Sequence, residues 1–388
     1  MKVAVIAPTE LPARRANTVQ VMKMAQALAL NGHSVRLAAP RAIQAQTAAL
    51  RSAAVDWDTL ARHYGLQQRF PVSWLPASPR LRRYDYSLRA LSWAAGWGAE
   101  WIYTRLPQAA ALSSMQGRPT IFEVHDLPQA GWGARLLELF LKGRGARRLV
   151  VITHALAADL AAAYGAPVDE PFTLVAPDGV DLQRYAGLPE PPDARRALAL
   201  PGLPPDRFTA GYTGHLYPGR GADLLLELAA RLPEMSFLVV GGEPVDVQRL
   251  SAAAAKRRLD NLLLTGFVPN ADLPRYQSAC DALLMPYAAQ VAASSGGDIA
   301  RYLSPMKLFE YLACGRVVLS SDLPVLQEVL NPGNALLLPG GDAPAWTAAL
   351  RRTAGDAELR QRLAQQARQD AARYTWEARA ARILPLKQ

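Results

Sequence analysis

The feature that most limits the fold of this 388-residue chain is an alternation of short apolar runs with longer helical segments. Short apolar runs bounded by turn signals are typical of buried strands, and strands that alternate with helices are typical of parallel sheets. The runs cover residues 3–7, 35–38, 120–124 and 149–152 in the first half, and 208–212, 237–240, 262–264, 282–285, 317–320 and 336–338 in the second. Two parallel sheets are therefore expected, in a chain long enough for two α/β domains.

A proline-rich segment separates the two alternating halves. Prolines stand at positions 189, 191, 192, 201, 204 and 205, a density that neither a helix interior nor a central strand tolerates. We therefore predict an N-terminal domain over 1–187, a linker over 188–205 and a C-terminal domain over 206–388. The alanine- and arginine-rich end of the chain could pack on either domain. Its last helix, from about residue 374 to 388, is the part expected to return to the N-terminal one.

Composition narrows the class of protein. The net charge of +10 admits nucleic acid, an anionic membrane surface or phosphorylated small molecules as partners. The arginines are spread along the chain without any nucleic-acid-binding motif, so nucleic acid is not expected as a partner. Cys280 and Cys314 lack metal-ligand and redox spacing, which predicts reduced core thiols in a cytoplasmic protein and no metal site. No window approaches the ~20 apolar residues of a membrane span, and the N-terminus is typical of a first strand.

Two segments leave membrane contact open. Residues 81–101 are rich in arginine and tryptophan, and residues 132–148 place leucines and a phenylalanine before a basic run. Either segment could lie peripherally on the inner, anionic face of a membrane. The favoured interpretation is an ordinary core helix with solvated arginines.

The glycine-rich loop at 214–221 follows a predicted strand and precedes a predicted helix. Such a loop, beginning here at Gly214, can direct backbone N–H groups at an anion, and Arg220 supplies a permanent cation that can bind phosphate oxygens. For a glycine-rich loop taken alone, an ordinary strand-to-helix turn that uses glycine for its conformation is the favoured interpretation. It is neither a Walker motif nor a dinucleotide fingerprint.

A second cluster spans residues 304–315. Ser304 can cap a helix and Pro305 is a favoured first helical residue, so a phosphate could sit at this helix terminus. Lys307 then lies in the first turn, where the helix dipole disfavours a cation unless an anion is bound nearby. Glu310 could accept hydrogen bonds from a ribose diol. The alternative for Glu310 is a solvated carboxylate paired with a basic neighbour.

Two further clusters follow predicted strands. His125 and Asp126 come directly after a buried strand, at the sheet edge where open α/β folds bind ligands. The Asp178-Gly179 sequence by itself predicts only a turn. The chain has no nucleophile elbow, His-Glu-x-x-His helix or close acidic pair that would indicate a hydrolase.

In this order the clusters resemble the retaining glycosyltransferases of the GT-B class, in particular glycosyltransferase family 4. The resemblance covers nearly the whole chain through the segments at 32–35, 177–181, 214–221, 264–268, 280–287 and 304–315. It implies two Rossmann-like domains that face each other across a cleft. It also implies transfer of a sugar from a nucleoside-diphosphate sugar with retention of configuration, without a metal or another cofactor.

The resemblance also implies roles for single residues. His125 contacts the transferred sugar, and Arg220 and His215 flank the phosphates, where the family carries an arginine and a lysine. Donor binding falls to Glu310 at the ribose, and to the residues around the diphosphate and the base. Those donor residues are Gly214, Ser304, Pro305, Met306, Lys307, Gly266, Phe267 and Val268. Asn17, Thr18 and Arg105 face the acceptor, which is a carbohydrate, a lipid-linked molecule or a small molecule.

The sequence departs from the family at the sugar-facing side. The family carries an acidic residue near the position of Tyr302, and Asp298 is the candidate substitute. His215 is the second departure, because a neutral imidazole contributes less than a guanidinium. Two alternatives therefore stay open: an epimerase or hydrolase of nucleotide sugars with the same fold, and a non-catalytic protein that binds nucleotide sugars.

Overall fold

The computed structural model describes residues 1–42, 55–128, 131–292 and 297–386. The chain divides into two compact units. The first unit comprises Met1–Asp178 together with Trp376–Gln388, and the second comprises Gly179–Thr375. Each unit is built around one parallel sheet, as the alternation of apolar runs predicts.

The first unit contains a seven-stranded sheet in the order β3-β2-β1-β4-β5-β6-β7, with every pair parallel. All four strands expected from the sequence are present. The remaining three strands, at 72–77, 101–104 and 173–175, lacked an apolar run long enough to stand out. The strands are β1 (Lys2–Ile6), β2 (Ser34–Ala42), β3 (Val72–Ala77), β4 (Trp101–Thr104), β5 (Thr120–Val124), β6 (Ala146–Val151) and β7 (Thr173–Val175).

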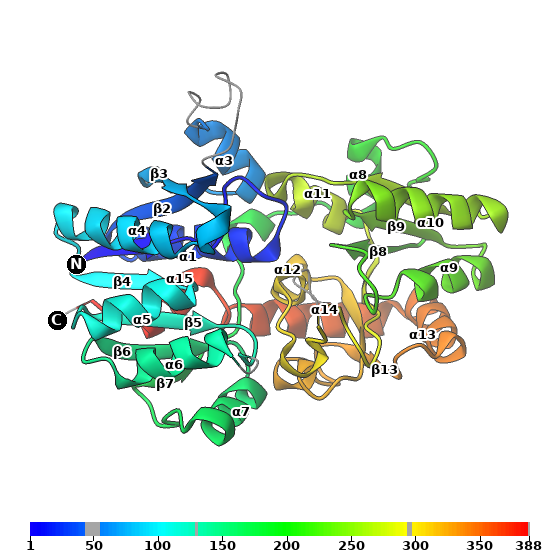
Figure 1. Cartoon of the computed structure of the whole chain (residues 1–388). Coiled ribbons are helices and arrows are strands. Elements are labelled where there is room, and N and C mark those ends of the chain that lie inside the picture. The colour runs from blue at the N-terminus through cyan, green and yellow to red at the C-terminus, as the bar shows by residue number, and fades with distance from the viewer. Residues whose placement is uncertain (43–54, 129–130, 293–296, 387–388) are drawn as a thin grey trace. The chain divides into compact units, whose positions relative to one another are not determined.

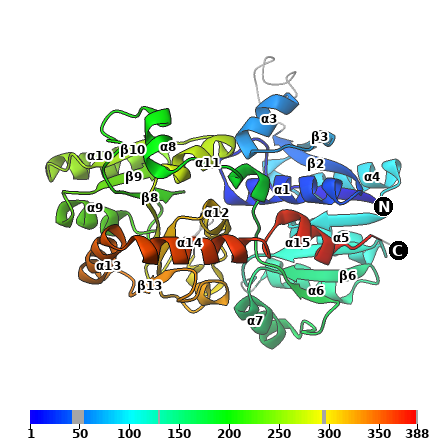
Figure 2. The same ribbon diagram turned by 180° about the vertical axis from the view of Figure 1, so that it is seen from behind.

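Helices cover both faces of this sheet. Three neighbouring helices, α4, α5 and α6, lie on one face (Figure 1). The first and last helices of the chain, α1 and α15, pack together on the other (Figure 2). The helices are α1 (Ala16–Leu30), α3 (Trp57–Tyr64), α4 (Tyr84–Trp97), α5 (Pro107–Met115), α6 (Trp132–Lys142), α7 (His154–Tyr164) and α15 (Trp376–Ile383).

The segments with membrane character form α4 and α6. Leu136, Leu137 and Phe140 of α6 are buried, which supports the interpretation of a core helix. The same helix leaves Trp132 66% and Leu139 43% exposed. No helix of the described residues is long and apolar enough to cross a membrane.

The second unit contains a six-stranded parallel sheet in the order β10-β9-β8-β11-β12-β13. All six strands were expected from the sequence, with ends within two residues of those found. The strands are β8 (Thr209–Thr213), β9 (Ser236–Val240), β10 (Leu262–Gly266), β11 (Ala282–Met285), β12 (Val317–Ser321) and β13 (Leu336–Leu338).

Successive side chains of these strands enter two separate cores. Phe237 and Val239 of β9 pack with Leu225 on one face of the sheet, whereas Leu238 and Val240 enter the core of the other face. This alternation follows from the two-residue period of a strand. The helices around the sheet are α8 (Pro191–Leu198), α9 (Ala222–Arg231), α10 (Pro244–Lys256), α11 (Leu273–Ser278), α12 (Met306–Cys314), α13 (Ala343–Gly355) and α14 (Ala357–Ala371). Cys280 and Cys314 are free and buried, as expected.

The prediction of a linker over 188–205, and of a first domain ending at 187, was wrong. The boundary lies between Asp178 and Gly179, and the proline-rich segment belongs to the second unit. Its prolines do not prevent a helix, because two of them stand in the first turn of α8, where a backbone N–H needs no partner. The buried Arg195 of α8 donates to Asp281 Oδ2 and to the Ala279 carbonyl, both at 2.8 Å.

The last helix returns to the first unit, where the sequence left its placement open. His33 Nε2 lies 3.0 Å from the carbonyl oxygen of Leu384, and Arg148 donates to the Ile383 carbonyl at 2.5 Å. These contacts join the end of the chain to the unit formed by its beginning.

The Arg195 contacts generate a stability prediction. Arg195→Met removes the counter-charge of Asp281 and leaves two backbone carbonyls without their donor, so the free energy of unfolding should fall by about 2–4 kcal/mol. Arg196→Met is the matched control, because the ion pair of Arg196 with Asp193 is mostly exposed and worth less than about 1 kcal/mol. Denaturant unfolding measures both, and equal losses would contradict the role given to Arg195.

Candidate functional site

Three glycines lie at the ends of neighbouring strands of the second unit. Together they form a surface without side chains, which we call the glycine floor. Gly214, Gly241 and Gly266 follow or end β8, β9 and β10, with φ of +130°, +111° and +71°. Gly241 donates to the Gly266 carbonyl at 2.8 Å, and a Cβ at Gly241 would lie 2.5 Å from the Gly214 carbonyl oxygen. Only glycine fits such a position without strain. The sequence indicated Gly214 and Gly266 but not Gly241, although a glycine pair directly after an expected strand is a usable signal.

A buried lysine lies beside this floor. The Nζ of Lys307 lies 3.7 Å from the ring centroid of Tyr212 and 5.5 Å from that of Tyr287. It has no hydrogen-bond partner among the described residues. Burial and the nearby charge of Arg220 hold the pKa of Lys307 well below its ordinary value, and Glu310 opposes them only in part. A buried amine without a counter-charge is costly, so this position suits an anionic ligand.

The loop at 214–221 is fixed by close packing. A Cβ at Gly219 would lie 2.0 Å from the Gln290 carbonyl oxygen, and one at Gly221 would lie 2.3 Å from Pro286. These glycines therefore serve the packing of the loop, as the ordinary-turn interpretation holds. Between them stands the half-buried Arg220, whose Nε has no hydrogen-bond partner within the described parts of the chain. The imidazole of His215 stacks on Tyr217, and its Nδ1 lies 3.8 Å from a Glu243 oxygen.

Glu310 lies in α12 and is only 9% exposed. Its Oε2 accepts a hydrogen bond from Gln277 Nε2 at 3.2 Å, and Gln277 in turn accepts one from the Tyr185 hydroxyl at 2.8 Å. The alternative of a solvated carboxylate with a basic partner is therefore wrong. Gln277 and Tyr185 were not singled out from the sequence, because neither belongs to a recognisable motif.

The start of α12 differs by one residue from the expectation. Pro305 is the N-cap, Met306 is the first helical residue, and no side chain caps the helix. Ser304 therefore does not act as the cap, because it lies one residue too early. The backbone N–H groups of the first turn are free of a side-chain cap, and Ser304, Pro305 and Met306 are half-buried.

The remaining donor-side candidates lie in two loops. Phe267 and Val268 are half-buried directly after β10, next to the glycine floor. Asp298 is exposed, and its Oδ1 accepts from the backbone N–H groups of Val291 and Ala300 at 2.8 and 2.9 Å. These bonds lower the pKa of Asp298 and fix the shape of its loop. Tyr302 is buried, and residues 293–296 of the same loop lie outside the described residues.

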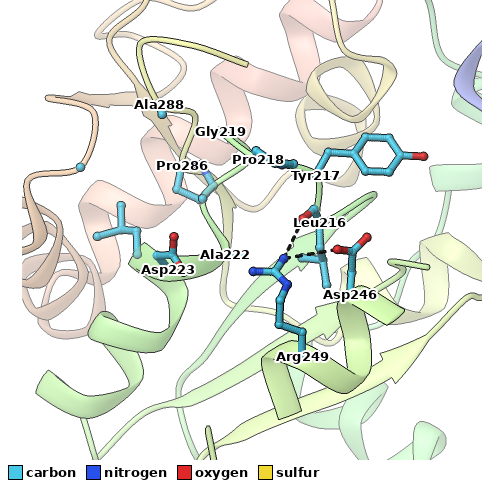
Figure 3. A pocket seen from close by; sticks show the side chains of 13 residues that line it. Leu216, Tyr217, Pro218, Gly219, Ala222, Asp223, Asp246, Arg249, Pro286 and Ala288 are labelled. Atoms are coloured by element: carbon cyan, nitrogen blue, oxygen red, sulfur yellow. Dashed lines mark hydrogen bonds and ion pairs between the residues drawn. The ribbon is translucent and has the colours of Figure 1, made fainter. Parts of the chain in front are cut away.

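The loop at 214–221 also borders a separate pocket of about 510 Å³ (Figure 3). Its walls are mainly apolar atoms of residues 216–219, 221–224, 286 and 288, and neither Lys307 nor Glu310 lines it. Arg249 reaches over from α10 and donates to Asp246 Oδ1 at 3.3 Å and to the Leu216 carbonyl at 3.5 Å. This arrangement fixes the backbone of Leu216 near the start of the loop.

In the first unit, His125 follows β5 and contacts a buried carboxylate. His125 Nε2 lies 2.5 Å from Oε1 of Glu123, whose side chain is completely buried. Arg379 of α15 binds the same carboxylate with two nitrogens, at 2.9 Å to Oε1 and 3.1 Å to Oε2. Gln20 donates to Oε1 at 2.6 Å, and the Tyr103 hydroxyl donates to Oε2. The sequence singled out His125 but gave no signal for the other four residues.

Burial favours the neutral form of both Glu123 and His125, but only His125 becomes neutral. It would raise the pKa of the Glu123 carboxyl, but the Arg379 charge and the His125 hydrogen bond outweigh it, so the pKa is held below its ordinary value. Burial, helped by the Arg105 charge, lowers the pKa of His125 to about 4. The pair is therefore a carboxylate and a neutral imidazole at neutral pH.

Asp178 lies close to this pair. One ligand atom from each of Glu123, His125 and Asp178 falls within 4.8 Å of the others, a spacing that could suit a metal ion. The oxygens of Glu123, however, already accept from Arg379, Tyr103, Gln20 and His125. The residues present do not fit a metal, because this carboxylate has no free oxygen to offer. Burial raises the pKa of Asp178 to about 7.

The three acceptor-side candidates differ in exposure. Thr18 is fully buried, and its hydroxyl donates within 2.8 Å to the backbone at the start of α1. Thr18 therefore stabilises a helix start and does not face outward as expected. Asn17 and Arg105 are half-buried, and Arg105 donates to Gln20 Oε1 at 3.2 Å. Arg105 thus lies next to the carboxylate that binds His125.

Two family models match this chain, and together they cover most of it. The model for Glycosyltransferase Family 4 matches residues 18–184, and the model for Glycosyl transferases group 1 matches residues 199–370. One match falls on each half of the chain.

Curated relatives carry names of sugar-transferring enzymes. A D-inositol 3-phosphate glycosyltransferase from Xylanimonas cellulosilytica is 32% identical over 61% of this chain and 55% of its own length. A 2-deoxystreptamine N-acetyl-D-glucosaminyltransferase from Streptomyces fradiae is 29% identical over 55% of this chain and 48% of its own length. The matched region thus spans about half the length of these relatives.

Solved structures share the fold over the whole chain. Sucrose-phosphate synthase from Thermosynechococcus elongatus has a TM-score of 0.73 and 19% identity, covering 98% of this chain and 96% of its own. HepE from Anabaena, solved in complex with UDP-glucose, has a TM-score of 0.72 and 17% identity over 99% of this chain and 98% of its own. The two parallel-sheet units and the two family matches agree, and the chain belongs to the GT-B glycosyltransferases of family 4, with a group 1 domain in its second half.

Proposed function

We propose that this protein transfers a sugar from a nucleoside-diphosphate sugar to an acceptor hydroxyl, with retention of configuration and without a metal. The observation that carries the proposal is the buried Lys307, whose Nζ has no hydrogen-bond partner among the described residues and lies beside the glycine floor at the ends of β8 and β9. A diphosphate supplies the missing negative charge there, and the uncapped start of α12 supplies further N–H donors.

The remaining donor contacts follow from the same placement. Glu310 accepts hydrogen bonds from the ribose, because its carboxylate is buried and oriented by Gln277. The backbone at 266–268 borders the base, and Arg220 and His215 reach the phosphates from the loop after β8. HepE, which shares the fold, was solved with UDP-glucose, and this supports a uridine nucleotide as the first donor to test.

The first unit is assigned the sugar and the acceptor. In this proposal His125 contacts the transferred sugar, and Asn17 and Arg105 contact the acceptor, a carbohydrate, a lipid-linked molecule or a small molecule. Because Trp132 and Leu139 of α6 are exposed, we also predict peripheral contact with an anionic membrane. Co-sedimentation with anionic liposomes tests this contact.

The mechanism needs no protein nucleophile. As the glycosidic bond to phosphate breaks, the sugar becomes oxocarbenium-like and negative charge grows on the leaving diphosphate. The diphosphate takes the proton of the acceptor hydroxyl, and the acceptor oxygen bonds to the anomeric carbon on the same face. Arg220 and Lys307 stabilise this state more than the intact donor, because the charge they meet grows during the reaction. The engagement of Glu123 by four donors supports the proposal that no metal takes part.

Nucleoside diphosphates should stabilise the protein in the presence of EDTA. At about 100 times its dissociation constant a ligand contributes ~2.7 kcal/mol, which raises the melting temperature by roughly 3–7 °C. A thermal-shift panel of UDP-, GDP- and ADP-sugars measures the effect and identifies the base. Lys307→Met should lose most of the shift, because a thioether brings no charge. Failure of every nucleotide to shift the unaltered protein would refute the donor site.

Donor binding should also take up a proton. The pKa of Lys307 lies well below its ordinary value in the free protein, and a bound diphosphate raises it by favouring the ammonium form. At a pH between the two values the amine therefore gains a proton. Titration calorimetry across neutral and alkaline pH, in buffers of different ionisation enthalpy, measures this uptake. A nucleotide sugar is the ligand of choice because its phosphates do not titrate at neutral or alkaline pH. Lys307→Gln should abolish the uptake, and unchanged uptake in that variant would contradict the assignment.

Arg220→Ala should lower kcat about 100- to 1,000-fold, the loss expected when a charged contact to the developing anion is removed. Arg231→Ala is the matched control, because Arg231 is exposed and pairs with Glu227 on the surface of α9. Product analysis with and without acceptor gives the rates and also separates transfer from hydrolysis or epimerisation of the donor. Near-normal turnover of Arg220→Ala would overturn its role.

A further inference from the structure

The carboxylate of Glu123 joins the last helix of the chain to the residue proposed to contact the sugar. Arg379 of α15 uses all three of its guanidinium nitrogens. Two of these nitrogens donate to the carboxylate of Glu123. The guanidinium also donates to the Ala176 and Pro177 carbonyls, at 3.0 and 2.9 Å. The side chain is 5% exposed. The end of the sequence is thereby fixed against the carboxyl end of β5, within two residues of His125.

The hydrogen-bonding capacity of this cluster determines which nitrogen of His125 carries the proton. An ionised carboxylate accepts hydrogen bonds and cannot donate them. Glu123 is ionised, because Arg379 binds both of its oxygens. At 2.5 Å from Oε1, His125 Nε2 must therefore be the donor. The neutral ring then has a lone pair on Nδ1, which makes that nitrogen an acceptor.

We propose that Glu123 and Arg379 are positioning residues, which hold His125 as its Nε2–H tautomer so that Nδ1 accepts a hydrogen bond from a hydroxyl of the transferred sugar. The proposal rests on the sugar-contacting role of His125 in the proposed function. It adds that the terminal helix α15 is part of the substrate-binding apparatus of the first unit. Without Arg379 the carboxylate would lack its counter-charge, and without Glu123 the imidazole ring could turn.

A purely structural ion pair is the competing explanation, and a charge-balanced substitution separates the two. Removing one partner strands a buried charge and can unfold the protein, whereas replacing both by apolar residues of similar volume is often neutral for stability. The double variant E123M/R379M therefore keeps the core filled while His125 loses its acceptor. Gln20 and Tyr103 can still bond each other, since their polar atoms lie 3.1 Å apart.

The first measurement concerns the free protein. Correlation spectra of the full chain with ¹⁵N-labelled histidine should show His125 with a proton on Nε2 and none on Nδ1, and the signal is assigned by its loss in His125→Gln. In E123M/R379M the slowly exchanging Nε2–H signal should disappear. A proton on Nδ1 in the unaltered protein, or an unchanged signal in the double variant, would overturn the proposal whether or not the protein proves to be a transferase.

The second measurement concerns turnover. E123M/R379M should lose roughly tenfold or more in kcat/KM for the donor, and the same two substitutions should cause no further loss in a His125→Ala background. Arg148→Met is the matched control, because Arg148 binds the end of α15 without contacting Glu123, and it should keep normal turnover. Normal kcat/KM in a folded double variant, or additive losses, would show that the pair is only structural. Absence of donor turnover by the unaltered protein would instead refute the proposed function.

Discussion

A parallel sheet brings the carboxyl ends of all its strands to one edge, and the arrangement of both candidate sites depends on this constraint. In the second unit glycines at or directly after the ends of β8, β9 and β10 leave the edge open, and α12 brings Lys307 to it. In the first unit the end of β5 presents Glu123 and, two residues later, His125. The strand order therefore decides which loops can share a ligand.

The two sheet edges differ in how a buried charge is paired within the protein. Glu123 has its counter-charge from Arg379, and its oxygens are fully used by neighbouring donors. Lys307 has aromatic rings around it but no carboxylate hydrogen bond among the described residues. The first arrangement is complete within the protein and is suited to fixing a neighbouring ring. The second is incomplete without an anion, as expected of a site for a charged ligand.

The last helix shows how a distant part of the sequence can complete a unit. α15 packs against α1 and inserts Arg379 between the ends of β5 and β7. The chain thus begins and ends in the same unit, and the proline-rich segment at 188–205 stays within the other. Prolines at a helix start are compatible with a packed helix, which is why their density was a misleading boundary signal.

The sequence by itself determined the two parallel sheets, all six strands of the second unit, the loops that carry Gly214 and His125, and the helix that carries Lys307. Apolar periodicity and turn residues are local signals, so they can be read without a fold. Only the tertiary structure placed Arg379, Gln20 and Tyr103 on Glu123, and Gln277 on Glu310. It also revealed that Thr18 is buried. These contacts join residues up to 256 positions apart, and no local pattern encodes which buried donor meets which acceptor.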